Sequence, residues 1–423
     1  MVVGLVAMAC GLAGGAAAWH AAARPIEGEC GGIVTVMKDP VSFGRGVSTV
    51  VKMNGVRYAV VAHGRLATRL IPRLAGESVR IEGSCAAVEG RSARWNRIAH
   101  VVGTIAPSSV SEEFSAGSMA ARASNRLRGA ISRGVASMSP TLRSLFMGLV
   151  IGDDRDQPRS MITQFRGSGL SHLCAVSGQN VSYLLAAMSP LLRRRRRHTR
   201  WLVTLGLIAW FAMLTRGEPS VLRAGVMAAF VATNAAVGVA MNARLVLCAT
   251  VASLLLLDPM LAWSVGFALS VGATAGLAWV SATLVRVVRV PVLGRRITGL
   301  NAVVASTLAA QVGTMPVSLA VFGSVPVVSL VTNPLAIAVA GAVMMFGLPF
   351  ALLSSMAPPL EPIASAVMSL PVAWVGAVAR VGSAVGPTGA VNGLLWCVVA
   401  VLICMAVHRN GRNREPGTTS VRT

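Results

Sequence analysis

The chain has 423 residues, of which 54% are hydrophobic and only 13% are charged, and its mean hydropathy is +0.67. Because soluble proteins carry about a quarter charged residues, this composition excludes a soluble protein. The formal net charge of +23 comes almost wholly from arginine, since Lys38 and Lys52 are the only lysines. Such an excess can bind a polyanion or orient a membrane protein. Orientation explains much of it, because the densest arginine clusters lie in short loops between apolar segments.

Residues 1–23 form the first apolar segment of the chain. The run Ala21–Ala23 could serve as the cleavage site of a signal peptide, but the segment lacks the basic start that such peptides have. A retained transmembrane anchor is therefore the better interpretation.

Residues 24–106 change to the pattern of β-strands. Short β-branched runs alternate with Gly, Asn and charged residues, and five such runs predict a small all-β barrel of the OB type. We expect this domain to be extracytoplasmic. The runs are GIVTVM, STVVKM, VRYAVVA, SVRIEG and RIAHVVGTI.

The same stretch is basic, with twelve Lys/Arg against six Asp/Glu. It is either a solvated surface or a groove for a nucleic-acid backbone, which OB barrels often provide. Aromatic residues for base stacking are few, namely Phe43, Tyr58 and Trp95, so both interpretations stay open. The candidate DNA-binding residues are Arg57, Arg65, Arg69, Arg91, Arg94 and Arg97.

Seven cysteines show no CxxC pair and no zinc spacing. Five lie in apolar segments, where cysteine usually acts as a small hydrophobe. Cys30 and Cys85 are the two in the basic β stretch, and in an oxidising compartment they could form a disulfide. The sequence leaves this pairing open, because it does not give the distance between the two residues.

Residues 107–147 are predicted to form amphipathic helices. From 112 to 146 apolar residues recur every three or four positions, while Arg122, Arg126 and Arg133 lie elsewhere on the helical wheel. Basic amphipathic helices beside membrane spans typically lie along the interface.

The rest of the chain predicts a polytopic α-helical membrane protein with about ten transmembrane segments, the first being residues 1–23. Alternating these segments places three basic loops on one side, which should be cytoplasmic, and the β domain on the other. The N- and C-termini are then cytoplasmic. The three basic loops are Arg193–Arg200, Arg286–Arg296 and His408–Arg414.

Motifs of several enzyme classes are absent. No G-x-x-x-x-G-K phosphate-binding loop occurs, the six histidines form no metal-binding cluster, and no G-x-S-x-G appears. The sequence therefore predicts no enzyme, no cofactor and no metal site, and any ATP-driven work must come from a partner.

Polar side chains remain within or beside the apolar segments, where each must find a partner away from lipid. Any one of them could be a cap or a brace, but as a group they suggest a hydrophilic path. Arg223 is the least easily dismissed, because it lies on a segment of small residues and so faces protein or water. The candidates are Asp153, Asp154, Arg155, His172, Ser177, Gln179, Asn180, Glu218, Arg223, Gln311 and Asn333.

At these residues the chain resembles the ComEC family of competence proteins, the inner-membrane channels for DNA uptake in natural transformation. Four blocks carry the resemblance: GLVIGDDRDQ with FRGSGLSHLCAVSGQNV at 148–181, GEPSVLRAGVM at 217–227, DPMLAWSVGFALSVGATAGL at 258–277, and STLAAQVGTMPVSLAVFGSVPVVSLVTNPLAI at 306–337. The resemblance implies a competence transmembrane domain over 148–408, followed by a basic cytoplasmic tail over 409–423.

Two departures from the family pattern matter. Many members have a histidine near Ser177-Gly178, where this chain has Gln179-Asn180, so a role resting on that histidine does not carry over. Many also end in a metallo-β-lactamase-like domain, whereas this sequence has no H-x-H-x-D-H. We therefore expect a separate nuclease to degrade the second strand, if it is degraded at all.

The leading hypothesis is a bacterial plasma-membrane channel that passes single-stranded DNA into the cytoplasm. Its expected partners are single-stranded DNA, membrane lipid, an extracytoplasmic DNA receptor and a cytoplasmic ATPase or single-strand-binding protein, with a homo-oligomer possible. The alternatives are a secondary transporter or lipid-handling protein with the same core, for which we find no inverted repeat, and a remnant that transports nothing.

Overall fold

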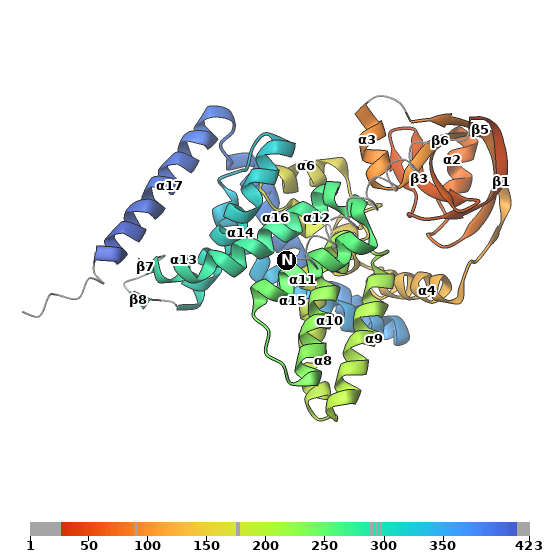
Figure 1. Ribbon diagram of the computed structural model, residues 1–423. Helices are drawn as coiled ribbons and strands as arrows, with labels where there is room; N and C mark the ends of the chain where they lie inside the picture. Colours follow the sequence, from red (N-terminus) through yellow and green to blue (C-terminus); the bar gives the residue numbers. More distant parts are fainter. Residues whose placement is uncertain are drawn as a thin grey trace, which may run out of the picture. The chain divides into compact units, whose positions relative to one another are not determined.

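The computed structural model describes residues 27–88, 91–174, 178–287, 291–292, 295–296 and 298–412 (Figure 1). The predicted anchor at 1–23, Ser177, and residues 413–423 of the predicted tail lie outside this part. The chain forms two compact units. Unit 1 comprises the described residues up to Arg159 with His172–Ala268 and Val339–Ala373, and unit 2 comprises Ser160–Ser171 with the described residues of Leu269–Ala338 and from Trp374 onward.

Unit 1 begins with a β-barrel that is consistent with the predicted OB-like domain. Its elements are β1 (Gly28–Val36), β2 (Val41–Phe43), β3 (Gly46–Met53), β4 (Val56–His63), α2 (Gly64–Leu70), β5 (Ser78–Ala87), α3 (Arg91–Ile98) and β6 (Val101–Ser115). β1 pairs with both β3 and β5, β3 with β4, and β5 with β6, all antiparallel. β4 and β6 pair in parallel and close the sheet. Without the short edge strand β2, the other five strands, with α2 between β4 and β5, have the connectivity of a Greek-key barrel of the OB type.

The local sequence explains both the tightest turn and the core of the barrel. Asn54 and Gly55 link β3 to β4 with positive φ angles of 49° and 87°, the conformation that a two-residue type I′ hairpin requires. Inside, alternate strand residues such as Val34 and Val51 are fully buried, and Leu70 of α2 packs into the same core. Each strand thus shows one face to the core and the other to solvent.

The boundaries after the barrel differ from the prediction. β6 starts at Val101, because Arg91–Ile98 is helical, and it continues past residue 106 to Ser115. The helical stretch therefore begins only with α4 (Met119–Arg133) and is broken before α5 (Pro140–Ile151). Ser144–Ile151 is buried throughout, so this part of α5 is a core segment and not one face of an amphipathic helix, while the interfacial position of the preceding helical stretch stays a prediction.

Helices make up the remainder of the described chain. Among the described residues, four stretches are long and apolar enough to cross a membrane: Pro219–Val237, Asn301–Phe322, Ser329–Met356 and Pro358–Val385. Shorter apolar helices include Ala243–Leu257, Val265–Trp279 and Gly389–Met405, so the protein is mostly helical and compatible with a membrane, while the count of ten spans stays a prediction. The remaining elements are α6 (Arg159–Gly167), α7 (Ser171–Cys174), α8 (Gly178–Arg193), α9 (Arg197–Leu214), α10 (Pro219–Val237), α11 (Ala243–Leu257), η1 (Pro259–Trp263), α12 (Val265–Trp279), α13 (Ser281–Val287), β7 (Pro291–Val292), β8 (Arg295–Arg296), α14 (Thr298–Phe322), α15 (Ser329–Met356), η2 (Pro358–Leu360), α16 (Glu361–Val385) and α17 (Gly389–Arg412).

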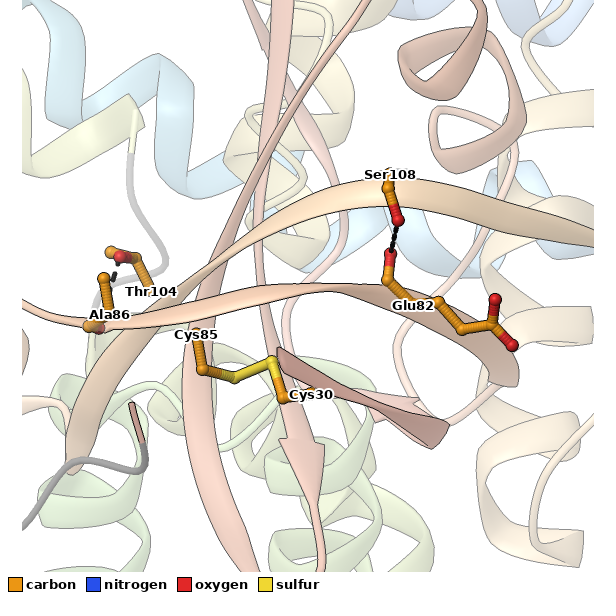
Figure 2. Close-up of a disulfide and its surroundings, with 6 residues drawn as sticks. All are labelled: Cys30, Glu82, Cys85, Ala86, Thr104 and Ser108. Carbon is orange, nitrogen blue, oxygen red and sulfur yellow. Dashed lines mark hydrogen bonds between the residues drawn. A yellow bond between two sulfur atoms is a disulfide. The ribbon is translucent and has the colours of Figure 1, made fainter. Parts of the chain in front are cut away.

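Cys30 and Cys85 form the disulfide that the sequence left open (Figure 2). It joins the neighbouring strands β1 and β5, with the two Cα atoms 5.7 Å apart. The side chains of Thr104 and Ser108 on β6 donate hydrogen bonds to the carbonyl oxygens of Ala86 and Glu82 on β5. The bridge therefore ties the first strand to a pair of strands that are also joined through side chains.

We predict that Cys30→Ser lowers the amount of folded protein. The bridge closes a loop with a sequence separation of 55, for which the chain-entropy relation gives a stabilisation of about 4 kcal/mol. Cys248→Ser is the matched control, because Cys248 is free and exposed. Folded yield of the membrane fraction measures the effect, and equal yields for the two variants would contradict it.

Candidate functional site

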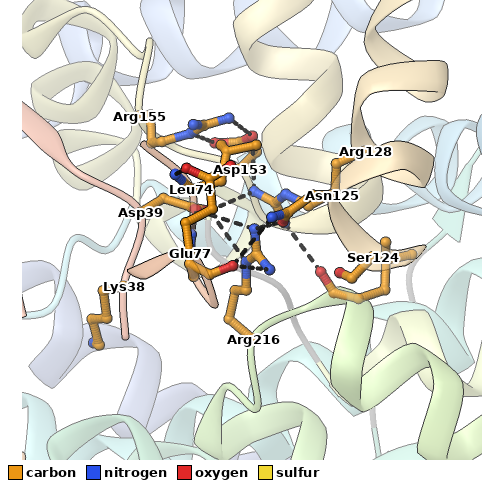
Figure 3. A network of polar contacts seen from close by, with 12 residues as sticks. Lys38, Asp39, Leu74, Glu77, Ser124, Asn125, Arg128, Asp153, Arg155 and Arg216 are labelled. Carbon is orange, nitrogen blue, oxygen red and sulfur yellow. Dashed lines mark hydrogen bonds and ion pairs between the residues drawn. The ribbon is translucent and has the colours of Figure 1, made fainter. Parts of the chain in front are cut away.

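A buried network of charges holds the barrel against the helices of unit 1 (Figure 3). Asp39 follows β1 of the barrel, and Arg128 on α4 lies 3.2 Å from it and 2.8 Å from Asp153. Arg155 donates two hydrogen bonds to Asp153, of 2.8 and 2.7 Å. Arg216, between α9 and α10, lies 3.0 Å from Asp39. The network thus joins four segments that are distant in sequence.

The network is nearly shielded from water, and each aspartate in it is paired with arginines. The side chains of Asp39, Arg128 and Asp153 are 8%, 6% and 6% exposed. Burial raises the pKa of Asp153, but the hydrogen bond from Arg155 and the charges of Arg128 and Arg155 outweigh it and lower that pKa to about 2. Asp153 is therefore ionised at neutral pH.

Uncharged oxygen atoms accept further hydrogen bonds from the arginines of the network. Three arginines face two aspartates, and Arg128 also donates to the carbonyl oxygen of Leu214 at 3.1 Å. Arg216 donates to the amide oxygen of Asn125 at 2.6 Å. The arginines are therefore held by hydrogen bonds as well as by ion pairs, although Nε of Arg128 has no hydrogen-bond partner among the described residues.

The sequence identified only part of this network. Asp153 and Arg155 were expected to line a polar path, but in the structure Asp153 pairs with both Arg155 and Arg128, so these residues brace the fold at this point. Asp39 and Arg128 were missed. Helical periodicity could have identified Arg128, because it lies three residues before the buried Ile131 and so shares its face of α4.

A second contact fixes the other side of the barrel. His100, just before β6, has a positive φ of 57°, and its Nε2 lies 3.0 Å from both carboxylate oxygens of Asp258. Asp258 ends α11 and accepts a hydrogen bond from the backbone N–H of Met260. Burial raises the pKa of Asp258, but the hydrogen bond and charge of His100 outweigh it, so that pKa is lowered.

Several of the predicted path residues gather near the start of α8, also in unit 1. Arg223 on α10 is buried and donates to the sulfur of Met227 at 3.1 Å. A Cβ at Gly178 would lie 2.9 Å from Nη2 of Arg223 and 2.8 Å from the Cβ of Ala224, so only glycine fits where α8 meets α10. Asn180, in the first turn of α8, donates to the carbonyl oxygen of Leu149 at 2.9 Å.

The other candidates of this unit lie at the surface or at a helix end. His172, Gln179 and Asp154 are exposed, and Glu218 is the N-cap residue of α10. Gln157 was missed: it is 8% exposed, and neither atom of its amide has a hydrogen-bond partner among the described residues.

In unit 2 the two predicted residues Gln311 and Asn333 share a polar neighbourhood. Ser329 donates its hydroxyl proton to the carbonyl oxygen of Pro326 at 2.5 Å, so it can only accept from the amide of Gln311, at 2.6 Å. This arrangement turns Oε1 of Gln311 away from Ser329. In the described part of the chain neither this atom nor Oδ1 of Asn333, one turn further along α15, has a hydrogen-bond partner. The pair therefore presents two buried acceptors.

The DNA-binding candidates of the barrel differ in their exposure and in their partners. Arg65 is exposed, whereas Arg69 pairs with Glu112 at 2.7 Å and Arg57 donates to the carbonyl oxygen of Ala99 at 3.2 Å. Tyr58 is fully buried in the barrel core, so its expected availability for base stacking is wrong. The side chains of Arg91, Arg94 and Trp95 lie outside the described residues, and Arg97 is half-buried.

One aromatic pair does reach the barrel surface. Phe43 on β2 is 36% exposed, and its ring meets the ring of His63 edge-on, with centroids 6.1 Å apart. The two residues lie beside each other because Phe43 pairs with Gly46, which in turn pairs with His63.

We predict that Arg128→Met destabilises the protein by about 3–5 kcal/mol, because it leaves Asp39 and Asp153 buried without their shared partner. Arg126→Met is the matched control, since Arg126 is exposed on the same helix. Thermal unfolding in mild detergent measures both. Equal shifts in the two unfolding temperatures would show that the network does not hold the fold.

Comparisons with known proteins show the family to which the chain belongs. The sequence model of the family described as "Competence protein" matches residues 149–411, more than half of the chain. ComE operon protein 3 of Bacillus subtilis (strain 168) is 26% identical over 200 residues, which are 47% of this chain and 25% of that protein. The match thus spans about a quarter of that relative's length, and no solved structure matches. The chain belongs to the competence protein family and is a ComEC-type member of it.

Proposed function

We propose that this protein is a plasma-membrane channel that imports single-stranded DNA during natural transformation. Its family membership carries the proposal, because a competence protein acts in DNA uptake. The structure adds one supporting observation: an OB-like barrel, a fold that often binds oligonucleotides, is fixed to the helices by a buried ion network. A receptor domain held in this way keeps a constant position relative to the helices that would conduct the strand.

In this proposal the outer face of β3 and β4 receives the strand, since this is the face that OB barrels use for oligonucleotides. Phe43 and His63 offer rings at one end of the face. Lys52, which pairs across the strands with Arg57, provides positive charge at the other end. Stacking rings and backbone-tracking cations are the two components of binding to single strands.

The conducting path would use polar groups within and beside the helices. Arg223, buried against Gly178, would offset phosphate repulsion, and His172 would contribute from the exposed helix α7. The free acceptors of Gln311 and Asn333 would take hydrogen bonds from water or from base amino groups. Roles on the path are also assigned to Asp154, Ser177, Gln179, Asn180 and Glu218.

The proposal includes an orientation and a set of partners. The barrel faces outward, both termini are cytoplasmic, and about ten segments cross the membrane. The protein itself is not an enzyme, so the movement of DNA is powered by a cytoplasmic ATPase or a single-strand-binding protein. A DNA receptor delivers the strand and a nuclease removes its complement.

We predict that Phe43→Ala lowers the affinity of the full-length protein for single-stranded DNA by about tenfold. Stacking of one base on an aromatic ring contributes about 1–3 kcal/mol. Phe114→Ala is the matched control, because Phe114 is also exposed but lies under the guanidinium of Arg73 on another part of the barrel. Fluorescence anisotropy with a labelled oligonucleotide measures both, and a larger loss for Phe114→Ala would place the binding face elsewhere.

The decisive test is transformation of a competent host. We expect deletion to abolish transformation, and Arg223→Ala or His172→Ala to reduce it at least about tenfold with normal membrane insertion, because a hydrogen bond to a charged group contributes about 1.5–3 kcal/mol. Arg126→Ala controls for loss of an exposed arginine. Unchanged transformation in the deletion strain would contradict uptake, and DNA-independent transport of a small solute would favour a secondary transporter.

A further inference from the structure

Exposed arginines gather at one end of the helices α8 to α11 in unit 1. All of the arginines in the turn between α8 and α9 are exposed, and Arg244, which follows the turn between α10 and α11, is exposed as well. We call these residues the arginine cap. Its members are Arg193, Arg194, Arg195, Arg196, Arg197, Arg200 and Arg244.

The two turns of the arginine cap lie next to each other. A Cβ at Gly238, which ends α10 with a positive φ of 82°, would lie 3.1 Å from Nη2 of Arg197. The guanidinium of Arg197 is thus at the C-terminal end of α10, where the helix dipole is negative. This contact brings the charges of both turns together on one surface.

No acidic side chain from these helices balances the arginine cap. The sequence contains no Asp or Glu between Gln157 and Gly217, and none between Pro219 and Leu257. Glu218 begins α10, at the end opposite to Gly238. Among the described residues, no salt bridge involves the six arginines from Arg193 to Arg200, so their charge is available to an external anion.

Apolar side chains surround the arginine cap and are themselves exposed. Leu191 and Leu202 flank the first turn and are 64% and 60% exposed, and Val237 and Leu245 flank the second at 68% and 55%. Beside them Trp201 donates its indole N–H to Thr233 at 3.0 Å. Arginines next to a band of exposed aliphatic residues and a tryptophan are typical of the boundary between lipid tails and headgroups.

Helix α9 separates the arginine cap from the buried ion network. The helix has 18 residues, or about 27 Å at 1.5 Å per residue. Its last residue, Leu214, accepts a hydrogen bond from Arg128 of the buried ion network, whereas its first turn carries part of the arginine cap. The cap and the network therefore lie at opposite ends of α9.

We propose that the arginine cap is a binding site for the phosphates of anionic phospholipids. The flanking aliphatic side chains would contact the acyl chains while several guanidinium groups share the headgroup phosphates, in the geometry by which arginine recognises phosphate. A nucleic-acid strand also carries phosphates, but it has no acyl chains that would pack against the exposed aliphatic side chains. This site does not depend on the proposed role in DNA uptake.

The test compares two double variants of the full-length protein in neutral detergent. Arg194→Gln/Arg195→Gln removes two charges from the arginine cap, and Arg122→Gln/Arg126→Gln removes two exposed charges from α4. Binding of phosphatidylglycerol and of phosphatidylcholine is followed by native mass spectrometry, with an oligothymidylate as the competing probe. We expect wild type to prefer phosphatidylglycerol, the cap variant to lose affinity about 30-fold, and the α4 variant to keep it.

Three results would overturn the proposal. Equal affinity of wild type for the two lipids would show that the cap does not recognise anionic headgroups. Equal losses of phosphatidylglycerol affinity in the two variants would show that binding depends on the total charge of the protein and not on the arginine cap. Loss of oligothymidylate binding in the cap variant, with phosphatidylglycerol binding intact, would assign the surface to nucleic acid.

Discussion

The ion network of Asp39, Arg128, Asp153, Arg155 and Arg216 is the constraint on which the arrangement of unit 1 depends. Each charge is taken from water at considerable cost, and only good geometry and further hydrogen bonds offset that cost. A barrel docked by apolar contact alone could slide over the helices, because hydrophobic attraction has no direction. Bidentate and shared ion pairs fix one orientation, since guanidinium and carboxylate groups are planar and match in a single geometry.

The contact between His100 and Asp258 fixes the barrel at a second point. Two attachment points prevent a domain from swivelling about one joint, and they differ chemically. The first consists of permanently charged arginines and buried aspartates, whereas the second includes a half-exposed histidine. The barrel is thus held rigidly between its first strand and its last, while the outer face of β3 and β4 stays open.

The sequence predicted those features that local pattern determines. Alternating β-branched residues placed five of the six barrel strands, all but the short β2. The pattern was misread at the run RIAHVVGTI, which was predicted as one strand. Its first two residues, Arg97 and Ile98, end helix α3, and strand β6 begins only at Val101. The burial of Tyr58 follows from strand alternation, because its neighbours Arg57 and Ala59 are partly exposed.

The candidate site was harder to predict, because its partners are distant in the chain. Arg128 and Asp39 are 89 residues apart, and Arg216 and Asp39 are 177 apart, so no local pattern pairs them. The sequence did indicate that charges near Asp153 matter, but it could not distinguish a brace from a path. Arg223 and Gly178 show the same limit, since their contact depends on how α8 and α10 pack.

The order of the network along the chain has a consequence for biogenesis. The barrel strands are complete at Ser115, before Arg128 and Arg216 have been synthesised, so the nascent barrel carries Asp39 in contact with water. The carboxylate exchanges this water for guanidinium groups only when α4 and the α9–α10 turn arrive. Docking of the barrel is therefore a dehydration step that joins two parts of unit 1. A chain interrupted before residue 216 would keep a hydrated, undocked barrel that cellular quality control could recognise.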